Sequence, residues 1–213
     1  MEKSNSARWG KSVQSRDEQH DLKRMAILRT AGRLFNQKGF RETSLNDLAH
    51  ELQVTKPTLY YYVENKEDIL FQCLLGAITY LLDQTETIQQ SQLSGIDKLT
   101  RFIHLFTSIL DDELGRCLAH PGPEPLSDKY QRQIDPLYVK LDANMRQIID
   151  HGVKDGSLRK CNPKITAFTI FGSIYWMTKW YQVGGEMTTK DVAEEMVAIF
   201  TNGLATPVAQ PPG

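Results

Sequence analysis

The stretch VTKPTLYYYVENKEDIL, residues 54–70, predicts a short helix, a break and the start of a longer helix. Pro57 fits the first turn of the short helix, because its missing N–H would have no intrahelical partner there. With Leu59 at the centre of the buried face, a rotation of about 100° per residue also turns Val63 inward. The outward residues are then Pro57, Thr58, Tyr60 and Tyr61, with Lys56 and Tyr62 at the flanks. Hydroxyl groups, aromatic edges and lysines suit phosphate oxygens and base edges, so this face predicts contact with nucleic acid.

Two further helices precede this stretch. Apolar residues at three- and four-residue spacings predict a helix from about residue 21 to Gly39, which suits a left-handed helix end. Ser44 is a natural N-cap for a short helix that ends near Gln53, and Asp47 completes a capping box. Two short helices packed on a preceding one form a helix-turn-helix, whose second member enters the major groove. We therefore predict a DNA-binding domain over residues 20–66, with residues 56–63 as its recognition helix.

These residues resemble the N-terminal signature of TetR-family transcriptional repressors. The resemblance covers roughly residues 24–70 and includes the lead-in Ala31-Gly32-Arg33-Leu34-Phe35, the pair Gly39-Phe40 and the tyrosine run. The family usually has a glycine where this chain has Gln53. At this turn Gln53 must either adopt a positive φ, at a modest cost in free energy, or change the geometry of the turn.

The resemblance also implies DNA contacts residue by residue. Thr43 and Ser44 would contact backbone phosphate, and Thr55 would cap the recognition helix. Base edges or sugars would be approached by Lys56, Pro57 and Thr58. Tyr60 and Tyr62 would hold phosphates, and Tyr61 would lie between the groove and its hydrophobic support. Lys66 would meet a phosphate with help from the helix dipole.

Composition bounds the class of protein. The 213 residues are 40% hydrophobic and 24% charged, which excludes a wholly disordered or fibrous chain. No apolar run reaches the roughly 20 residues that cross a bilayer, and the N-terminus does not read as a secretory signal. The three cysteines form neither a disulfide framework nor a metal cluster. We therefore expect a cytoplasmic protein with no membrane association, and the family resemblance implies that it is bacterial.

The net charge of −1 would by itself argue against a nucleic-acid binder. Divided along the chain, however, residues 1–62 carry +4 and residues 63–213 carry −5. A basic front and an acidic rear indicate two roles, although an asymmetry of this size also arises by chance.

The rest of the chain predicts an all-α protein. Its expected helices begin at Lys66 and then cover residues 96–112, 128–155, 164–183 and 188–204, with a loop at 119–127. We predict a helical ligand-binding and dimerisation domain over residues 67–204. Residues 1–19 and 205–213 are expected to be a disordered arm and tail.

The predicted helix 164–183 is apolar almost all round and must be covered on every side. One chain of this size has too few helices to surround it, so a second copy is implied. With the last helix it would form a four-helix dimer interface. The interface candidates are Ile170, Ile174, Met177, Val192, Met196 and Phe200.

The family resemblance further implies a small-molecule pocket among these helices. Its candidate lining is Phe102, Phe106, Met145, Trp176 and Trp180, with polar help from Arg101, His104 or His120. Taken one by one, such residues more often belong to the core or the surface than to a pocket. The pattern Tyr175-Trp176 with Trp180-Tyr181 is similar, over residues 170–204, to the branch that responds to acyl-CoA or fatty acids.

Two other classes of protein, an enzyme and a protein-binding adaptor, fit the sequence less well. The sequence gives little support for an enzyme, because no Gly-rich phosphate loop, GxSxG, HExxH or CxxC pattern occurs. A catalytic pair of Cys117 and His120, brought together by the fold, remains an alternative. A helical protein-binding adaptor would not need the tyrosine-rich outward face. We predict no enzyme, no cofactor and no metal, but a repressor dimer. The dimer would bind a palindromic operator. An apolar effector would release it by changing the spacing of the two recognition helices, with the helix that begins at Lys66 as the lever.

Overall fold

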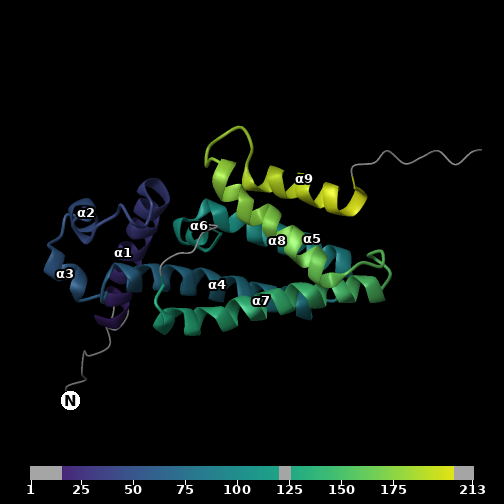
Figure 1. Ribbon diagram of the computed structural model, residues 1–213, viewed down its shortest axis with the longest axis horizontal. Helices are drawn as coiled ribbons and strands as arrows, with labels where there is room; N and C mark the ends of the chain where they lie inside the picture. The colour runs from purple at the N-terminus through teal and green to yellow at the C-terminus, as the bar shows by residue number, and fades with distance from the viewer. Residues whose placement is uncertain (1–15, 120–125, 204–213) are drawn as a thin grey trace, which may run out of the picture.

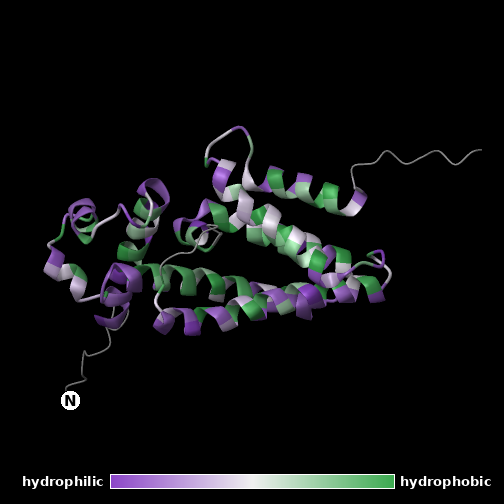
Figure 2. Ribbon diagram, in the orientation of Figure 1, coloured by the Kyte–Doolittle hydropathy of each residue, from purple (hydrophilic) through white to green (hydrophobic). Residues whose placement is uncertain are grey.

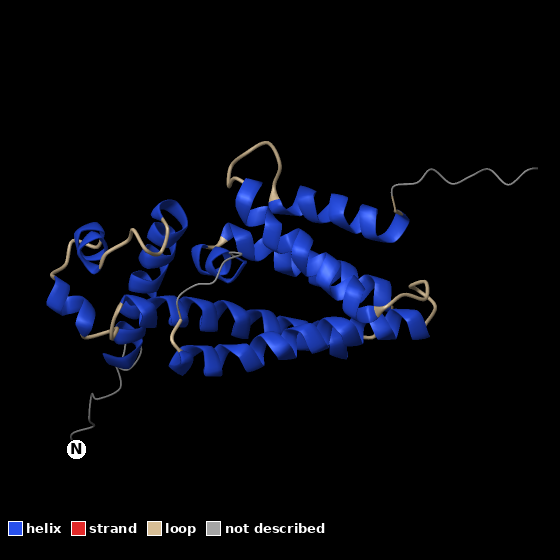
Figure 3. Cartoon of the chain, in the orientation of Figure 1, coloured by secondary structure: helices blue, strands red, loops and turns tan. Residues whose placement is uncertain are grey.

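The computed structural model describes residues 16–119 and 126–203 (Figure 1). Within these ranges every regular element is helical (Figure 3), which confirms the predicted all-α class. In chain order the elements are α1 (Arg16–Lys38), α2 (Leu45–Glu51), α3 (Lys56–Tyr60), α4 (Lys66–Gln90), α5 (Gly95–Ser108), the 3₁₀ turn η1 (Ile109–Asp111), α6 (Glu113–Ala119), α7 (Asp128–Lys154), α8 (Pro163–Trp180) and α9 (Thr189–Asn202). No described helix combines the length and apolar character that a bilayer crossing requires.

In the N-terminal unit α2 packs against α1, and α3 packs against α2. Helix α1 begins at Arg16, so the predicted disordered arm is wrong for residues 16–19, and residues 1–15 lie outside the described chain. Asp17 and Glu18 in its first turn favour this earlier start, because carboxylates stabilise the positive end of a helix dipole. The predicted tail 205–213 also lies outside the described residues.

The turn between α2 and α3 contains the residue that departs from the family pattern. Gln53 adopts φ +55°, in the left-handed region that costs little only for glycine. The family geometry of this turn is therefore kept, at the expense of local backbone strain.

Helix α4 joins the N-terminal unit to the body. Asn65 caps it by accepting a hydrogen bond from the Asp68 N–H at 2.9 Å. The helix contacts α1, α5, α6 and α7, and α7 runs beside it in the same direction (Figure 1). Figure 2 shows that the part of α4 next to the N-terminal unit is largely hydrophobic, in keeping with its position between the other helices.

The segment after α5 forms a helix that the sequence pattern did not predict. The expected helix 96–112 ends at Ser108, and α6 follows after η1. A Cβ atom on Gly115 would lie 2.0 Å from the Ile109 carbonyl oxygen, so only glycine allows the chain to turn this tightly. As a result α6 lies between α1 and α8, across α4 (Figure 1).

The core of the body is a cluster of aromatic rings between α5 and α8. The ring of Phe106 makes edge-to-face contacts with Phe102, Phe171 and Tyr175, at centroid distances of 5.9, 5.7 and 5.5 Å. Burial of each ring of this size contributes roughly 2–3 kcal/mol to the free energy of unfolding. This cluster fixes α8 on the body.

The far end of the body is closed by the turn after α7. Asp155 accepts hydrogen bonds from the backbone N–H groups of Gly95 and Ser157, at 2.7 and 2.8 Å. Hydrogen bonding from Ser157, and then from Gly95, lowers the pKa of Asp155 to about 2. The ionised carboxylate therefore ties α7 to the start of α5.

Candidate functional site

Helix α3 presents the outward face that the helical repeat predicted. Leu59 is 0% exposed and Val63 is buried, so these two side chains hold the helix on its domain. Tyr60 and Tyr61 are 51% and 74% exposed. Lys56, Pro57 and Thr58 are exposed as well. A surface with this content has hydrogen-bond donors and aromatic edges available to a nucleic acid.

The predicted capping of α3 by the Thr55 side chain is wrong. Thr55 occupies the N-cap position, but its hydroxyl makes no capping hydrogen bond. It lies 2.9 Å from the Thr58 hydroxyl instead. The two hydroxyls therefore form one polar pair at the exposed start of the helix.

The tyrosine run is supported by a residue that the sequence did not point to. The Tyr62 ring is half-buried and lies 4.8 Å from the His20 ring of α1, centroid to centroid. Tyr61 makes edge contacts with both, at 5.1 Å from Tyr62 and 5.7 Å from His20. His20 precedes the first apolar position of the predicted helix, so only the earlier start of α1 brings it here.

Ser44 and Thr43 differ in their availability. The exposed Ser44 caps α2, accepting a hydrogen bond from the Asp47 N–H at 3.1 Å in a complete capping box. Thr43 is 3% exposed, and its hydroxyl donates to the Gly39 carbonyl at 2.8 Å. The predicted phosphate contact of the Thr43 side chain is therefore wrong, because this hydroxyl closes the turn after α1.

Lys66 is also committed within the chain. Its ammonium donates to the carbonyl oxygens of Phe40, Arg41 and Thr43, at 2.8, 3.1 and 2.8 Å. It also lies 4.6 Å from the centre of the Phe40 ring. An ammonium has three donors, and all three are used. In the absence of DNA the side chain therefore ties the start of α4 to the turn between α1 and α2, and the phosphate contact of Lys66 stays a prediction.

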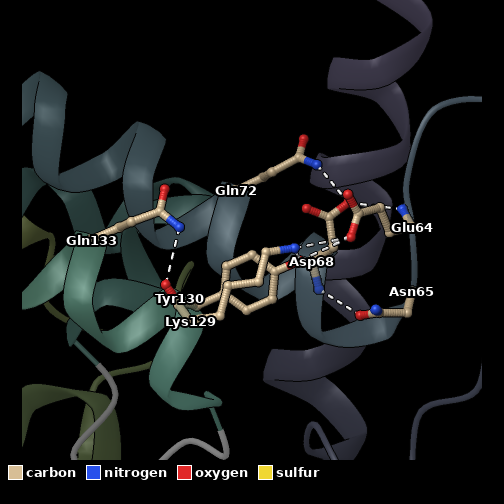
Figure 4. A network of polar contacts seen from close by, with 7 residues as sticks. All are labelled: Glu64, Asn65, Asp68, Gln72, Lys129, Tyr130 and Gln133. Atoms are coloured by element: carbon tan, nitrogen blue, oxygen red, sulfur yellow. Dashed lines mark hydrogen bonds and ion pairs between the residues drawn. The ribbon is translucent and has the colours of Figure 1, made fainter.

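A second set of contacts joins the DNA-binding unit to α7 (Figure 4). Asp68 accepts hydrogen bonds from the Glu64 N–H and the Gln72 amide, at 2.9 and 2.8 Å. The Glu64 carboxylate in turn pairs with the Lys129 ammonium at 3.2 Å. The stacked rings of Phe71 and Tyr130, 4.5 Å apart, support this junction. The residues just after the recognition helix are thus tied to both α4 and α7.

On α8 the residues that we predicted for the dimer interface are buried, and those that we predicted for the ligand pocket are exposed. Ile170, Ile174 and Met177 are buried inside the chain, so their assignment to the surface of a dimer interface is wrong. Trp176 and Trp180 are 62% and 47% exposed, so they do not line an internal pocket. The core lies on the side of α8 opposite to the tryptophans, because α8 packs on α5 and α7 there.

The remaining candidates divide in the same way. Phe102, Phe106 and Met145 are all 0% exposed and are packed in the core, which leaves no open lining at these side chains. On α9, Val192 is buried, whereas Met196 and Phe200 are half-buried at its edge. The candidate His120 lies outside the described residues.

An exposed apolar stripe remains on α8. It consists of the large apolar side chains of Ile165, Phe168, Trp176 and Trp180, which are all exposed to solvent. Ile199 of α9 is exposed as well, and the half-buried Phe200 shares a hollow with Ile165. Several large apolar side chains exposed along one helix are typical of a protein–protein interface.

The cysteines and the possible metal ligands can be placed in the described part of the chain. Residues 16–119 and 126–203 contain no group of three His, Cys, Asp or Glu side chains placed to hold a metal ion. Cys117 is buried, with its sulfur 3.8 Å from the Asn36 side-chain oxygen. Hydrogen bonding with Cys117, and then burial, raises the pKa of the Cys73 thiol. Both sulfurs are therefore placed as core groups.

Comparison with known proteins identifies the family. Residues 27–73 match the model for bacterial regulatory proteins of the tetR family, and residues 92–204 match that for the tetracyclin repressor-like C-terminal domain. The chain belongs to the TetR family. This confirms the predicted helix-turn-helix class, and the N-terminal match covers the second half of α1, all of α2 and α3, and the start of α4.

Relatives of this TetR-family chain include regulators with known names. The HTH-type transcriptional repressor KstR2 of Rhodococcus jostii is 26% identical over 196 residues, which cover 87% of this chain and 92% of the relative. The structure of PfmR from Thermus thermophilus has a TM-score of 0.77 at 26% identity, covering 84% and 99% of the two chains. AibR, solved with isovaleryl coenzyme A and operator DNA, has a TM-score of 0.75 at 23% identity, covering 84% and 97%, and shows the shared fold.

Proposed function

We propose that this TetR-family chain is a ligand-responsive transcriptional repressor that binds a palindromic operator as a homodimer. The observation that carries the proposal is the exposed face of α3, which is held by buried Leu59 below and by His20 at its side. We assign DNA reading to residues 20–66, and sensing and pairing to residues 67–204. The protein acts where bacterial DNA is, in the cytoplasm.

The proposed DNA contacts are assigned to side chains at the surface around α2 and α3, among which the Ser44 hydroxyl also bonds Asp47. Base edges or sugars are approached by Lys56, Pro57 and Thr58, and phosphates are held by Ser44, Tyr60, Tyr61 and Tyr62. Thr43 and Lys66 act indirectly, because their polar groups already bind the backbone of the turn after α1. They set the position of α2 and α3 relative to α4.

The proposed dimer uses the exposed apolar stripe of α8 and the outer edge of α9. Trp176 and Trp180 lie on this stripe, and Met196 and Phe200 lie at the edge of α9. Large aromatic side chains are enriched in the cores of protein–protein interfaces. A two-fold axis through this surface would present two α3 helices to two half-sites of an operator.

The proposed effector is a small, predominantly apolar molecule, with an acyl-CoA or a fatty acid as the class suggested by the pattern around Trp176 and Trp180. The complex of AibR with isovaleryl coenzyme A and operator DNA is a precedent for this fold. Binding would favour a spacing of the two α3 helices that no longer fits both half-sites, which requires different affinities for the two arrangements.

Fluorescence anisotropy with a labelled duplex from the upstream region of the protein's own gene tests the proposal. We expect saturable binding that weakens as salt is raised and that exceeds binding to a scrambled duplex. Tyr61→Ala should weaken operator binding at least five-fold, because the most exposed tyrosine of α3 is lost. Val139→Ala, which alters a side chain of similar exposure on α7, should leave it unchanged. No binding of the wild-type chain at low salt would overturn the proposal.

A further inference from the structure

A cavity of about 450 Å³ lies where the DNA-binding unit meets the body. It is bounded by α1, by the middle of α4, and by the segment from the end of α5 into α6. Its volume falls in the range of about 300–1,000 Å³ that is usual for small-molecule sites. The apolar part of its lining includes Met25, Ala77, Ile109 and Leu114.

One ion pair crosses the cavity wall. The Arg29 guanidinium of α1 donates to one Asp112 oxygen at 2.8 Å. The other Asp112 oxygen accepts the N–H groups of Leu114 and Gly115, at 2.9 and 3.4 Å, and so holds the start of α6. Asp112 therefore has a structural role that does not depend on Arg29.

The unused hydrogen-bonding capacity at this wall belongs to Arg29. A guanidinium has five N–H donors, and the described contacts of Arg29 use one of them. The pair is also largely exposed, so breaking it costs little. A ligand that supplies a negatively charged oxygen can therefore bind Arg29 without unmaking α6.

The wall formed by α4 contains a glycine that packing inside the chain does not explain. Gly76 lies in the interior of α4, where glycine is among the least favourable residues. A Cβ atom placed on Gly76 would have no neighbour within 4 Å. No side chain or backbone group of the described chain requires a glycine there, but the cavity that Gly76 lines would be narrowed by any larger residue.

We propose that this cavity is a binding site for an amphipathic organic anion. The apolar part of the ligand would lie against Ala77 and Leu114, next to the open wall at Gly76. Its carboxylate or other oxyanion would bind Arg29 in place of Asp112. The inference deepens the proposed function, because it assigns an effector class and a site on which α1 of the DNA-binding unit can move.

The consequence for α1 follows from how it is attached to α6. Besides the Arg29 pair, the Asn36 amide donates to the Glu113 carbonyl at 2.9 Å. The backbone of Glu113 also lies so close to Gly32 that an added Cβ would be 3.1 Å from its oxygen. A ligand at Arg29 would release one end of this contact while Asn36 keeps the other, so α1 would tilt and carry α2 and α3 with it.

Titration with two fluorescent probes tests the site in the absence of DNA. 8-Anilinonaphthalene-1-sulfonate carries an aromatic body and an anion, and N-phenyl-1-naphthylamine is its uncharged counterpart. We expect Gly76→Leu to weaken binding of the sulfonate probe at least ten-fold, because the leucine fills the cavity. Thr79→Leu, which adds the same side chain on an exposed position of α4 away from the lining, should change the affinity less than two-fold.

Arg29→Met tests the anion. It should weaken binding of the sulfonate probe by at least ten-fold and binding of the uncharged probe by less than three-fold. Thermal unfolding of each variant confirms that the chain is folded, which leucine in place of a helical glycine favours. The proposal is overturned if the wild-type chain binds neither probe, if Gly76→Leu and Thr79→Leu behave alike, or if Arg29→Met affects both probes equally. None of these results depends on an operator, so they leave the proposed repressor function to its own test.

Discussion

Replacement of Lys66 distinguishes two roles for this side chain, a structural role in the turn after α1 and a contact with a DNA phosphate. In Lys66→Met the aliphatic stem is kept and the ammonium is lost, together with its hydrogen bonds to the carbonyls of Phe40, Arg41 and Thr43. A hydrogen bond to a charged group contributes about 1.5–3 kcal/mol, but these carbonyls lie near the surface and can be rehydrated. We therefore expect a loss of about 3 kcal/mol in the free energy of unfolding, well below the sum of three full contributions.

The expected loss corresponds to a fall in Tm of about 6–12 °C for a chain of this size. Operator affinity, measured well below Tm, should also fall, because the turn that positions α2 is released. The slope of log affinity against log salt should not change, since no phosphate contact is removed. The matched variant is Lys56→Met on α3, where the side chain is exposed.

For Lys56→Met we expect the reverse pattern. Its Tm should change by less than about 1–2 °C, as is usual for exposed positions. Its salt slope should become shallower by about 0.9 for each bound subunit, because the positive charge that Lys56 brings to the DNA, and the counterion it releases, are lost. The reasoning is refuted if Lys66→Met keeps the wild-type Tm and lowers the salt slope, since the ammonium would then bind DNA rather than the turn.

Three other outcomes follow from the structure. Trp176→Glu should shift the chain toward monomer in sedimentation velocity, whereas Val139→Glu, at an equally exposed apolar position of α7, should not; identical sedimentation of both would argue against the α8 interface. Gln53→Gly should raise the free energy of unfolding by about 0.5–1 kcal/mol, because φ +55° costs glycine nothing, and an unchanged or lower Tm would contradict the strain. Asp155→Asn should destabilise the chain at pH 7. Because hydrogen bonding from Ser157 lowers the folded pKa of Asp155 to about 2, below its unfolded value, the difference from wild type should shrink as pH falls from about 4 toward 2; a difference independent of pH would count against the ionised carboxylate.

The recognition helix was predictable in detail because its packing is local. The 3.6-residue repeat determines which side chains share a face, and the position of Leu59 then determines which face is buried. Ser44 with Asp47 was predictable for the same reason, since a capping box depends on residues three positions apart.

Lys66 and α8 were not predictable in the same way. A lysine side chain can swing toward DNA or toward its own backbone, and its position at a helix N-terminus does not decide between them. For α8, an apolar pattern on all sides predicts that every side is covered, but not which side faces the core and which the partner. Ile174 and Trp176 therefore exchanged roles once the positions of α5 and α7 were known. The cavity at Arg29 depends on α6, a helix whose pattern was too short to predict.

The unbroken length of α4 has a geometric consequence. At about 1.5 Å per residue, the 25 residues from Lys66 to Gln90 span about 37 Å from the DNA-binding unit to the far end of the body. A rigid rod of that length that pivots by about 5° at one end moves its other end by about 3 Å. Successive base pairs are about 3.4 Å apart. A rearrangement of the body that hardly disturbs its packing is thus enough to displace the recognition helix by about one base-pair step.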